Sequence, residues 1–194
     1  MLILDLCGGT GAWSAPYRNA GYHTLIIDPA IECIDLGIKC TVEQFIKYPH
    51  SYIKKRIHGI IAAPPCTEFA RSGARWWKDK NPQLLADAIT TVQACLKAID
   101  ILKPHWWVLE NPVGRLARMV PALERHTASY QPWEYGDPYT KRTCLWGQFT
   151  MPPKTPVYPS KGSKLWHLGP SPERAKLRSI TPTGFANAFY KANP

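Results

Sequence analysis

Hydrophobic residues along this chain follow two different spacings. Short apolar runs fill residues 2–6, 24–27, 57–62, 106–109 and 143–146, and each has the length of a buried strand. In residues 82–102 apolar side chains recur every three or four positions instead, which predicts one long amphipathic helix with Pro82 in its first turn. Helices are also predicted at residues 13–20, 113–125 and 181–193. Because strands alternate with helices, we predict an α/β protein with a Rossmann-like, doubly wound and mostly parallel sheet.

The alternation of strands and helices stops in residues 148–178. This segment is rich in proline, lysine, glycine and serine and has no regular apolar spacing, which is typical of an irregular surface insertion. We therefore predict a single domain over residues 1–194. Residues 148–178 would be a small insertion in it, and residues 179–194 a closing C-terminal helix.

Composition narrows the class of protein. A chain of 194 residues that is 45% hydrophobic can bury a substantial core, and its formal net charge of +10 suits a polyanionic partner such as nucleic acid. We expect no membrane association, because no apolar run reaches the length of a membrane span and the N-terminus lacks the pattern of a signal peptide. The expected location is the cytoplasm.

The cysteines carry no metal-binding pattern. No CxxC spacing and no cluster with histidine occurs among Cys7, Cys33, Cys40, Cys66, Cys95 and Cys144. We therefore expect no metal site, and reduced thiols of the kind found in cytoplasmic proteins.

A glycine-rich turn follows the first predicted strand. The sequence of residues 5–14 is DLCGGTGAWS, and glycines at such a place let the backbone approach a ligand closely. The spacing is not the dinucleotide fingerprint, and no phosphate-binding lysine follows it. Asp28 ends the second strand and could accept hydrogen bonds from both hydroxyls of a ribose. The glycine-rich turn and Asp28 together predict an adenosine-type cofactor, although a glycine turn alone is often only structural.

Two strand ends carry the residues that could perform chemistry. Residues 59–66 read GIIAAPPC and residues 107–112 read WVLENP, so Cys66 and Glu110 each follow an apolar run. In a parallel sheet both ends lie on one edge, where open α/β proteins build their sites. A cysteine thiolate can add to a pyrimidine carbon while a carboxylic acid protonates the ring nitrogen. The alternative for Cys66 is a buried structural thiol, but the two prolines and the polar loop beside it disfavour that reading.

Together these motifs resemble those of the S-adenosylmethionine-dependent DNA cytosine-5 methyltransferases. The glycine turn is similar to their first motif, ProProCys at 64–66 to their nucleophile motif and GluAsnPro at 110–112 to their glutamate motif. Residues 136–147, GDPYTKRTCLWG, resemble their later basic motif, and residues 181–188, TPTGFANA, their closing motif. The motifs occur in the family's order over nearly the whole chain, as in a minimal, phage-like member.

The resemblance implies a role for each matching residue. For S-adenosylmethionine, the methionine and adenosine parts would lie among Asp5, Cys7, Gly8, Gly9 and Gly11, and the ribose against Asp28 and Pro29. Thr41 stands near the position where the family usually has an aspartate that reads the adenine amine. Pro64 would line both cofactor and base, and Leu84 or Leu85 would pack on the cofactor. Cys66 would attack carbon 6 of a flipped cytosine while Glu110 protonates the ring, and the substrate would be bound by Pro65, Arg71, Arg75, Asn111, Lys141 and Arg142.

The loop after the nucleophile, residues 67–81, is basic and aromatic. Arginines and lysines alternate there with Trp76 and Trp77, a composition that suits contacts with phosphates and bases. The tryptophans could equally anchor the loop on the domain. Lys141 and Arg142 could also be an ordinary solvated charge pair rather than substrate contacts.

The insertion is much shorter than the target-recognition domain that family members usually carry. This difference predicts a monomeric enzyme of a bacterial or phage-infected cell that methylates double-stranded DNA with short or weak sequence specificity. The same fold could instead act on RNA or a free pyrimidine nucleotide, or transfer a modified group. A third alternative is an inactive DNA-binding scaffold, which the presence of both Cys66 and Glu110 disfavours.

Overall fold

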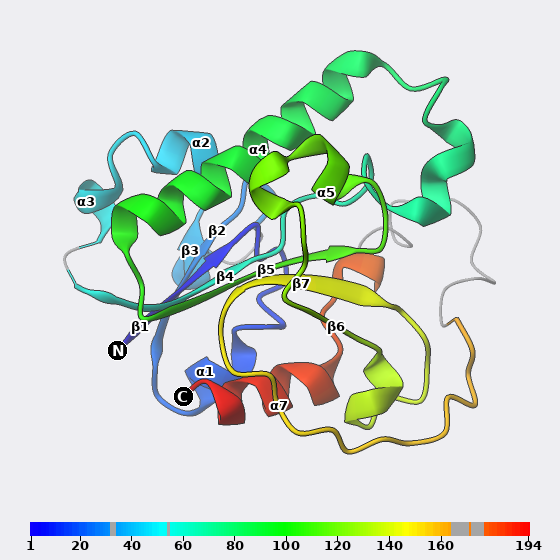
Figure 1. The fold of residues 1–194 in the computed structure, drawn as a ribbon. Coiled ribbons are helices and arrows are strands. Elements are labelled where there is room, and N and C mark those ends of the chain that lie inside the picture. The colour runs from blue at the N-terminus through cyan, green and yellow to red at the C-terminus, as the bar shows by residue number, and fades with distance from the viewer. Residues whose placement is uncertain (32–33, 54, 164–170, 172–176) are drawn as a thin grey trace.

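The structure is a computed structural model, which describes residues 1–31, 34–53, 55–163, 171 and 177–194. Its centre is a seven-stranded sheet in the order β3-β2-β1-β4-β5-β7-β6 (Figure 1). The first five strands in the chain pair in parallel, whereas β7 runs antiparallel to β5 and β6 antiparallel to β7. The strands are β1 (Leu2–Leu6), β2 (His23–Ile27), β3 (Gly37–Ile38), β4 (Ile57–Ala62), β5 (Trp106–Pro112), β6 (Ala128–Tyr130) and β7 (Thr143–Gln148).

Helices cover both faces of this sheet and make a three-layer molecule (Figure 1). One face carries the long helix α4 (Pro82–Leu102) with α2 (Val42–Phe45), α3 (Pro49–Tyr52) and α5 (Leu116–Met119). The other face carries α1 (Ala15–Asn19) and α7 (Thr183–Ala192). Each face has its own apolar core, because the residues of β1, β4 and β5 point alternately to one side and the other.

Helix α4 has clear sequence reasons for its two ends. The Asn81 side chain accepts a hydrogen bond from the Gln83 N–H at 2.9 Å, and Pro82 takes the first helical position, where no N–H is needed. At the other end Lys103 adopts a left-handed conformation with φ of 44°, which stops the helix. The helix shares one apolar core with β4 and β5, and so supports the strand that precedes Cys66 and the strand that contains Glu110.

Aromatic side chains hold α7 against the sheet. The Tyr130 and Phe185 rings stack with centroids 3.6 Å apart, and Trp13 contacts Phe185 from the α1 side at 5.8 Å. The Tyr17 hydroxyl donates a hydrogen bond of 2.9 Å to the Asn193 carbonyl just beyond α7. The C-terminal helix is therefore part of the fold's core.

The predicted fold class is confirmed, and the apolar runs at 2–6 and 57–62 and the helix at 82–102 have the predicted bounds. The predicted helix at 113–125 is wrong in length: α5 ends at Met119, and a short 3₁₀ turn, η3 (Pro121–Leu123), follows it. Pro121 explains this end, because it has no N–H and disfavours a helical residue before it. The helices predicted at 13–20 and 181–193 form, each shorter than predicted.

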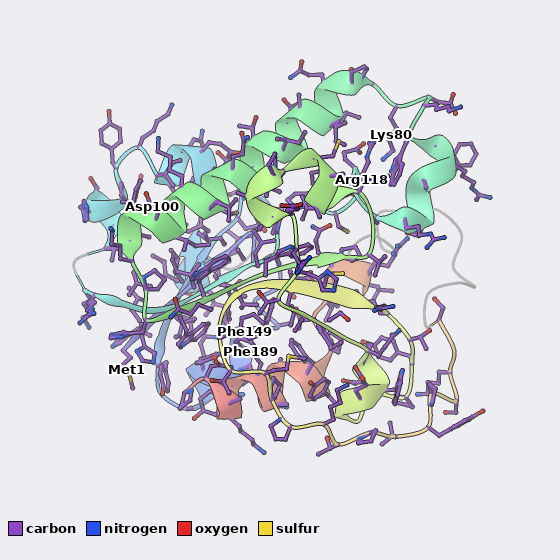
Figure 2. The ribbon with its side chains drawn as sticks, viewed as in Figure 1. Met1, Lys80, Asp100, Arg118, Phe149 and Phe189 are labelled. Carbon is purple, nitrogen blue, oxygen red and sulfur yellow. The ribbon has the colours of Figure 1, made fainter. Side chains whose placement is uncertain are left out.

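The described part of the predicted insertion lies along the body of the protein. Residues 149–163 contain no helix or strand. The Thr155 and Val157 N–H groups donate to the carbonyls of Glu134 and Trp133 in the 3₁₀ helix η4 (Pro132–Tyr135), at 2.9 and 2.8 Å. At the start of the segment Phe149 packs on Phe189 of α7, as Figure 2 shows. Residues 164–170 and 172–176 of the insertion, and Cys33, lie outside the described residues.

None of the helices in the described ranges has the length and apolar character needed to cross a membrane.

Candidate active site

A cavity of about 330 Å³ opens at the carboxyl ends of β1, β4 and β5. Many of the predicted site residues line it together, although they come from four distant parts of the chain. These residues are Asp5, Cys7, Gly8, Gly9, Pro64, Pro65, Cys66, Glu110, Lys141 and Arg142. Since the sheet order places β1 beside β4 and β4 beside β5, the glycine turn lies at one end and the residues before β7 at the other.

The glycine turn is held by the carboxylate of Asp28. The Gly9 N–H donates to Asp28 Oδ2 at 2.9 Å, and the Ala30 N–H donates to Oδ1 at 2.7 Å. Gly9 and Gly11 have φ values of 51° and 66°, which are unfavourable for residues with a side chain. Asp28 therefore fixes the turn from the end of β2, and it does not itself line the cavity.

Asp5 is a buried carboxyl group at the beginning of this turn. Ser14 Oγ donates a 2.5 Å hydrogen bond to Asp5 Oδ2, yet burial is the stronger effect and raises the pKa of Asp5 to about 6. A Cβ atom added at Gly8 would lie 2.5 Å from Asp5 Cγ. Glycine at position 8 is thus required by the packing of the turn against Asp5.

Cys7 lies in the same turn and lines the cavity. A hydrogen bond with Cys95 of α4, followed by burial, raises the pKa of Cys7 well above its ordinary value. A neutral thiol is a poor nucleophile. Cys7, whose thiol is engaged with Cys95, therefore forms part of the wall of the cavity.

The loop that carries Cys66 is tied directly to the segment that carries Glu110. The Asn111 Nδ2 group donates to the Pro64 carbonyl at 3.1 Å, and the Arg71 N–H donates to the Val113 carbonyl at 2.8 Å. Arg115 adds two more bonds, from its N–H to the Phe69 carbonyl at 2.9 Å and from Nε to the Glu68 carbonyl at 2.8 Å. These four bonds fix the two catalytic candidates relative to each other.

Burial and charge act on Cys66 and Glu110 in the same way. Burial raises the pKa of the Cys66 thiol, and the nearby carboxyl group of Glu110 raises it further, while Lys141 and Arg178 oppose the shift. Burial also raises the pKa of Glu110, again opposed by Lys141. Both groups thus have raised pKa values, and Lys141 is placed to stabilise the anion of either one.

Asn111 is fully buried behind this pair. Its Oδ1 atom has no hydrogen-bond partner among the described residues, although Nδ2 is bound to the Pro64 carbonyl. Asn111 does not line the cavity. Its position is that of a brace between β5 and the Cys66 loop.

Other predicted site residues lie away from the cavity. Thr41 caps α2: its Oγ1 accepts from the Gln44 N–H at 3.2 Å, and its own N–H donates to Gln44 Oε1 at 2.9 Å. Leu84 is 51% exposed in the first turn of α4, and Pro29 is also exposed. The cavity in this structure is lined by none of Gly11, Asp28, Pro29, Thr41, Arg71, Arg75, Leu84 and Asn111.

The two tryptophans of the basic loop have different environments. Trp77 lies under the guanidinium of Arg115, whose Cζ is 4.3 Å from the ring centroid. Trp76 is 55% exposed, and Arg75 stacks on it at 4.9 Å. The loop is thus anchored by Trp77 and presents Trp76 with Arg75 at the surface, in the 3₁₀ helix η2 (Arg71–Trp76).

The cavity also has walls that sequence reasoning missed. Tyr139, Thr140 and Thr181 fall within the two later motifs, so their position was open to prediction. Ser72, Ser163 and Ser179 line the cavity as well, and no spacing or motif in the sequence marks them. Arg178 also lines it, and the sequence marks this residue only as one of several basic residues of the insertion that could hold a nucleic-acid backbone. In the part of the chain that the structure describes, no group of three or more His, Cys, Asp or Glu residues is arranged to hold a metal ion.

Comparison with known proteins gives the same assignment of the fold. The structure resembles the crystal structure of a prophage-encoded E. coli protein, provisionally described as a DNA modification methyltransferase, with a TM-score of 0.57 and 16% identity over 81% of this chain. The chain has a methyltransferase fold. Its sequence is 28% identical over 131 residues, 60% of this chain, to the Type II methyltransferase M.DdeI of Desulfomicrobium norvegicum (strain DSM 1741 / NCIMB 8310). No protein-family model matches this chain.

Both of these proteins are longer than the present chain. It spans 29% of the length of M.DdeI and 53% of the prophage-encoded protein. The sequence relative is named as a Type II methyltransferase, and the protein of similar fold is provisionally described as a DNA modification methyltransferase.

Proposed function

We propose that this protein is a DNA (cytosine-5) methyltransferase that uses S-adenosylmethionine and forms a covalent adduct through Cys66. The observation that carries the proposal is the common cavity of Cys66 and Glu110, whose two loops are joined by four hydrogen bonds. A thiol and a carboxyl group held together in this way are the pair that addition to a pyrimidine ring requires.

The end of the cavity near β1 fits S-adenosylmethionine. Asp5 is the carboxyl group that lines this end, and an anion there would face a cationic sulfonium. Each Asp28 oxygen accepts one backbone N–H and keeps a lone pair for a ribose hydroxyl. The proposed contacts of Cys7, Gly8, Gly9, Gly11, Pro29, Thr41, Pro64 and Leu84 complete the site. When bound, the cofactor supplies the electrophilic methyl group that carbon 5 receives.

Cys66 and Glu110 then divide the ring chemistry between them. The Cys66 thiol loses its proton to solvent as sulfur bonds to carbon 6, and Glu110 gives its proton to the ring nitrogen that receives the displaced electron pair. Once carbon 5 is methylated, its proton leaves to water, the ring expels Cys66 as a thiolate, and Glu110 recovers the nitrogen's proton. The raised pKa of Glu110 keeps the acid protonated to a higher pH than an ordinary glutamate.

Double-stranded DNA is the proposed substrate. The formal net charge of +10 favours a polyanion, and the sequence relative M.DdeI is named as a Type II methyltransferase. Carbon 6 of cytosine is inaccessible in a stacked duplex, so the base must be flipped into the cavity. The described part of the insertion is a strand-free segment bound along η4, which favours short or weak sequence recognition.

A duplex that contains 5-fluorocytosine tests the mechanism. Fluorine at carbon 5 cannot leave as a proton, so the protein should remain bonded to the DNA through Cys66 only when S-adenosylmethionine is present. A denaturing gel should show the shifted band for wild type and for Cys40→Ser, since Cys40 does not line the cavity. Cys66→Ser should give no band. A band that persists in Cys66→Ser, or no band from a protein that methylates ordinary DNA, contradicts the proposed adduct.

Mass spectrometry of nucleosides tests the substrate and the transferred group separately. DNA, RNA or deoxycytidine monophosphate is incubated with the protein and S-adenosylmethionine, then digested. We expect 5-methylcytosine from duplex DNA and none from RNA or the free nucleotide. A different modified base, or modification of RNA alone, would replace the proposed reaction with one of the alternatives on the same fold.

A further inference from the structure

The half of the cavity beside Cys66 is strongly cationic. Among the described residues that line it, Lys141, Arg142 and Arg178 are positively charged, and Glu110 is the carboxyl group. Burial raises the pKa of Glu110, so this group offsets the cations less than an ordinary glutamate would. Hydroxyl groups of Ser72, Thr140 and Ser163 line the same half. Such a wall suits an anion with several oxygen acceptors.

Arg178 reaches this wall from the C-terminal end of the insertion. Its Nη2 donates a 2.8 Å hydrogen bond to Ser72 Oγ, across 106 positions of sequence. Ser72 belongs to η2, the helix directly after the nucleophile loop. The same C-terminal segment is held by Lys141, whose Nζ donates to the Ile180 carbonyl at 3.4 Å. Arg178 is also near enough to Cys66 for its charge to favour the thiolate.

We propose that Arg178 is a phosphate-binding residue of this cavity, which takes the phosphate of the nucleotide whose base lies against Cys66. The inference rests on the proposed function for the identity of the base. A guanidinium has five N–H donors in a fixed plane, and the bond to Ser72 uses one of them and sets its orientation. Residues 177–180 thereby hold the target strand, and they replace part of a separate recognition domain.

Protection of Cys66 from alkylation measures this contact without methyl transfer. The protein is treated with iodoacetamide, and the modification of Cys66 is followed by peptide mass spectrometry, with Cys40 of the same sample as internal reference. Deoxycytidine monophosphate, deoxycytidine and inorganic phosphate are the probes. In wild type we expect the monophosphate to protect Cys66 at a concentration about tenfold or more below that of the nucleoside, since the difference is one charge-assisted contact.

Three variants separate phosphate binding from a structural link. Arg178→Gln should raise the half-protecting concentration of the monophosphate about tenfold and leave that of deoxycytidine unchanged, whereas Arg178→Lys should stay within about threefold of wild type. Ser72→Ala should also stay within about threefold, because it removes only the partner that orients Arg178. Arg118→Gln, on the exposed side of α5 (Figure 2), is the matched control and should behave as wild type.

Each contrary result overturns the proposal. Equal loss of protection in Ser72→Ala and Arg178→Gln would make Arg178 a structural link only. Equal protection by monophosphate and nucleoside in wild type, or no protection by the monophosphate at all, would leave no phosphate contact to assign. Failure of the proposed function is a separate outcome, because it is read from modified nucleosides and not from alkylation.

Discussion

Replacing Asp5 by asparagine should change the stability of the protein, relative to wild type, more favourably at neutral pH than in acid. In the unfolded chain the carboxyl group has its ordinary pKa of 3.8, whereas burial raises the pKa to about 6 in the folded protein. Below pH 3.8 both states are protonated, and Asp5 costs no stability. As the pH rises from 3.8 through 6 the unfolded chain loses its proton first, so stability falls, and the full cost is present above pH 6.

The size of this effect follows from the two pKa values. Their difference corresponds to about 3 kcal/mol of unfolding free energy at neutral pH. Asparagine keeps an oxygen that can accept the bond from Ser14 Oγ, but its amide N–H groups add a cost of their own, which does not change with pH. The stability of Asp5→Asn relative to wild type should therefore improve by about 2.5 kcal/mol between pH 4 and pH 7.5, because a small part of the cost is already present at pH 4.

Urea unfolding at pH 4, 5, 6 and 7.5 measures this difference for Asp5→Asn and wild type. Asp100→Asn, an exposed carboxylate on α4 (Figure 2), is the control and should change stability by no more than about 0.5 kcal/mol at any of these values. A stability difference between Asp5→Asn and wild type that is the same at pH 4 and pH 7.5 would refute the reasoning. The buried carboxyl group would then have an ordinary pKa in the folded protein.

Two further substitutions test how the site is assembled. Asp28→Ala should weaken S-adenosylmethionine binding by about 1.5–3 kcal/mol in calorimetry. The substitution removes the proposed ribose acceptors together with the 2.9 Å hydrogen bond from the Gly9 N–H. Unchanged affinity would remove Asp28 from the cofactor site. Gly114→Ala places a Cβ 1.8 Å from the Phe69 carbonyl oxygen, so the backbone must shift. We expect a loss of about 1–3 kcal/mol in the free energy of urea unfolding, and slower 5-fluorocytosine trapping in the fraction that folds. Wild-type behaviour in both assays would show that the two loops need no close contact.

The elements predicted well from sequence are those whose signals agree locally. Helix α4 has a regular apolar spacing, an asparagine cap and a proline at its first position, and all three point to the same start. Strand β4 is a mostly apolar run, and two prolines follow shortly after it. The strands β3 and β6 have only two and three residues, and neither carries such a signal. Their conformation is set by pairing with β2 and β7, which the sequence of one segment cannot encode.

In the candidate site, too, residues within local motifs could be predicted, whereas residues placed by the tertiary path of the chain could not. Residues inside compact motifs, such as Cys66 and Glu110, were predictable because each motif ends a buried strand on a known edge of the sheet. Thr41 was placed by its distance along the chain, but its hydroxyl is used to cap α2. Arg178 reaches the cavity only because the C-terminal segment folds back to Ser72. Such a contact depends on the tertiary path of the chain and leaves no local pattern.

Lys141 connects the two halves of the proposed chemistry. Before addition, a charge must form on the Cys66 sulfur, and Lys141 lowers the thiol's raised pKa. After addition, sulfur is a neutral thioether and the ring nitrogen holds the proton of Glu110, so the negative charge has moved to the carboxylate. Lys141 opposes the raised pKa of Glu110 as well, and thus stabilises that carboxylate. One fixed cation therefore stabilises both charged states of the reaction, the thiolate before addition and the carboxylate after it.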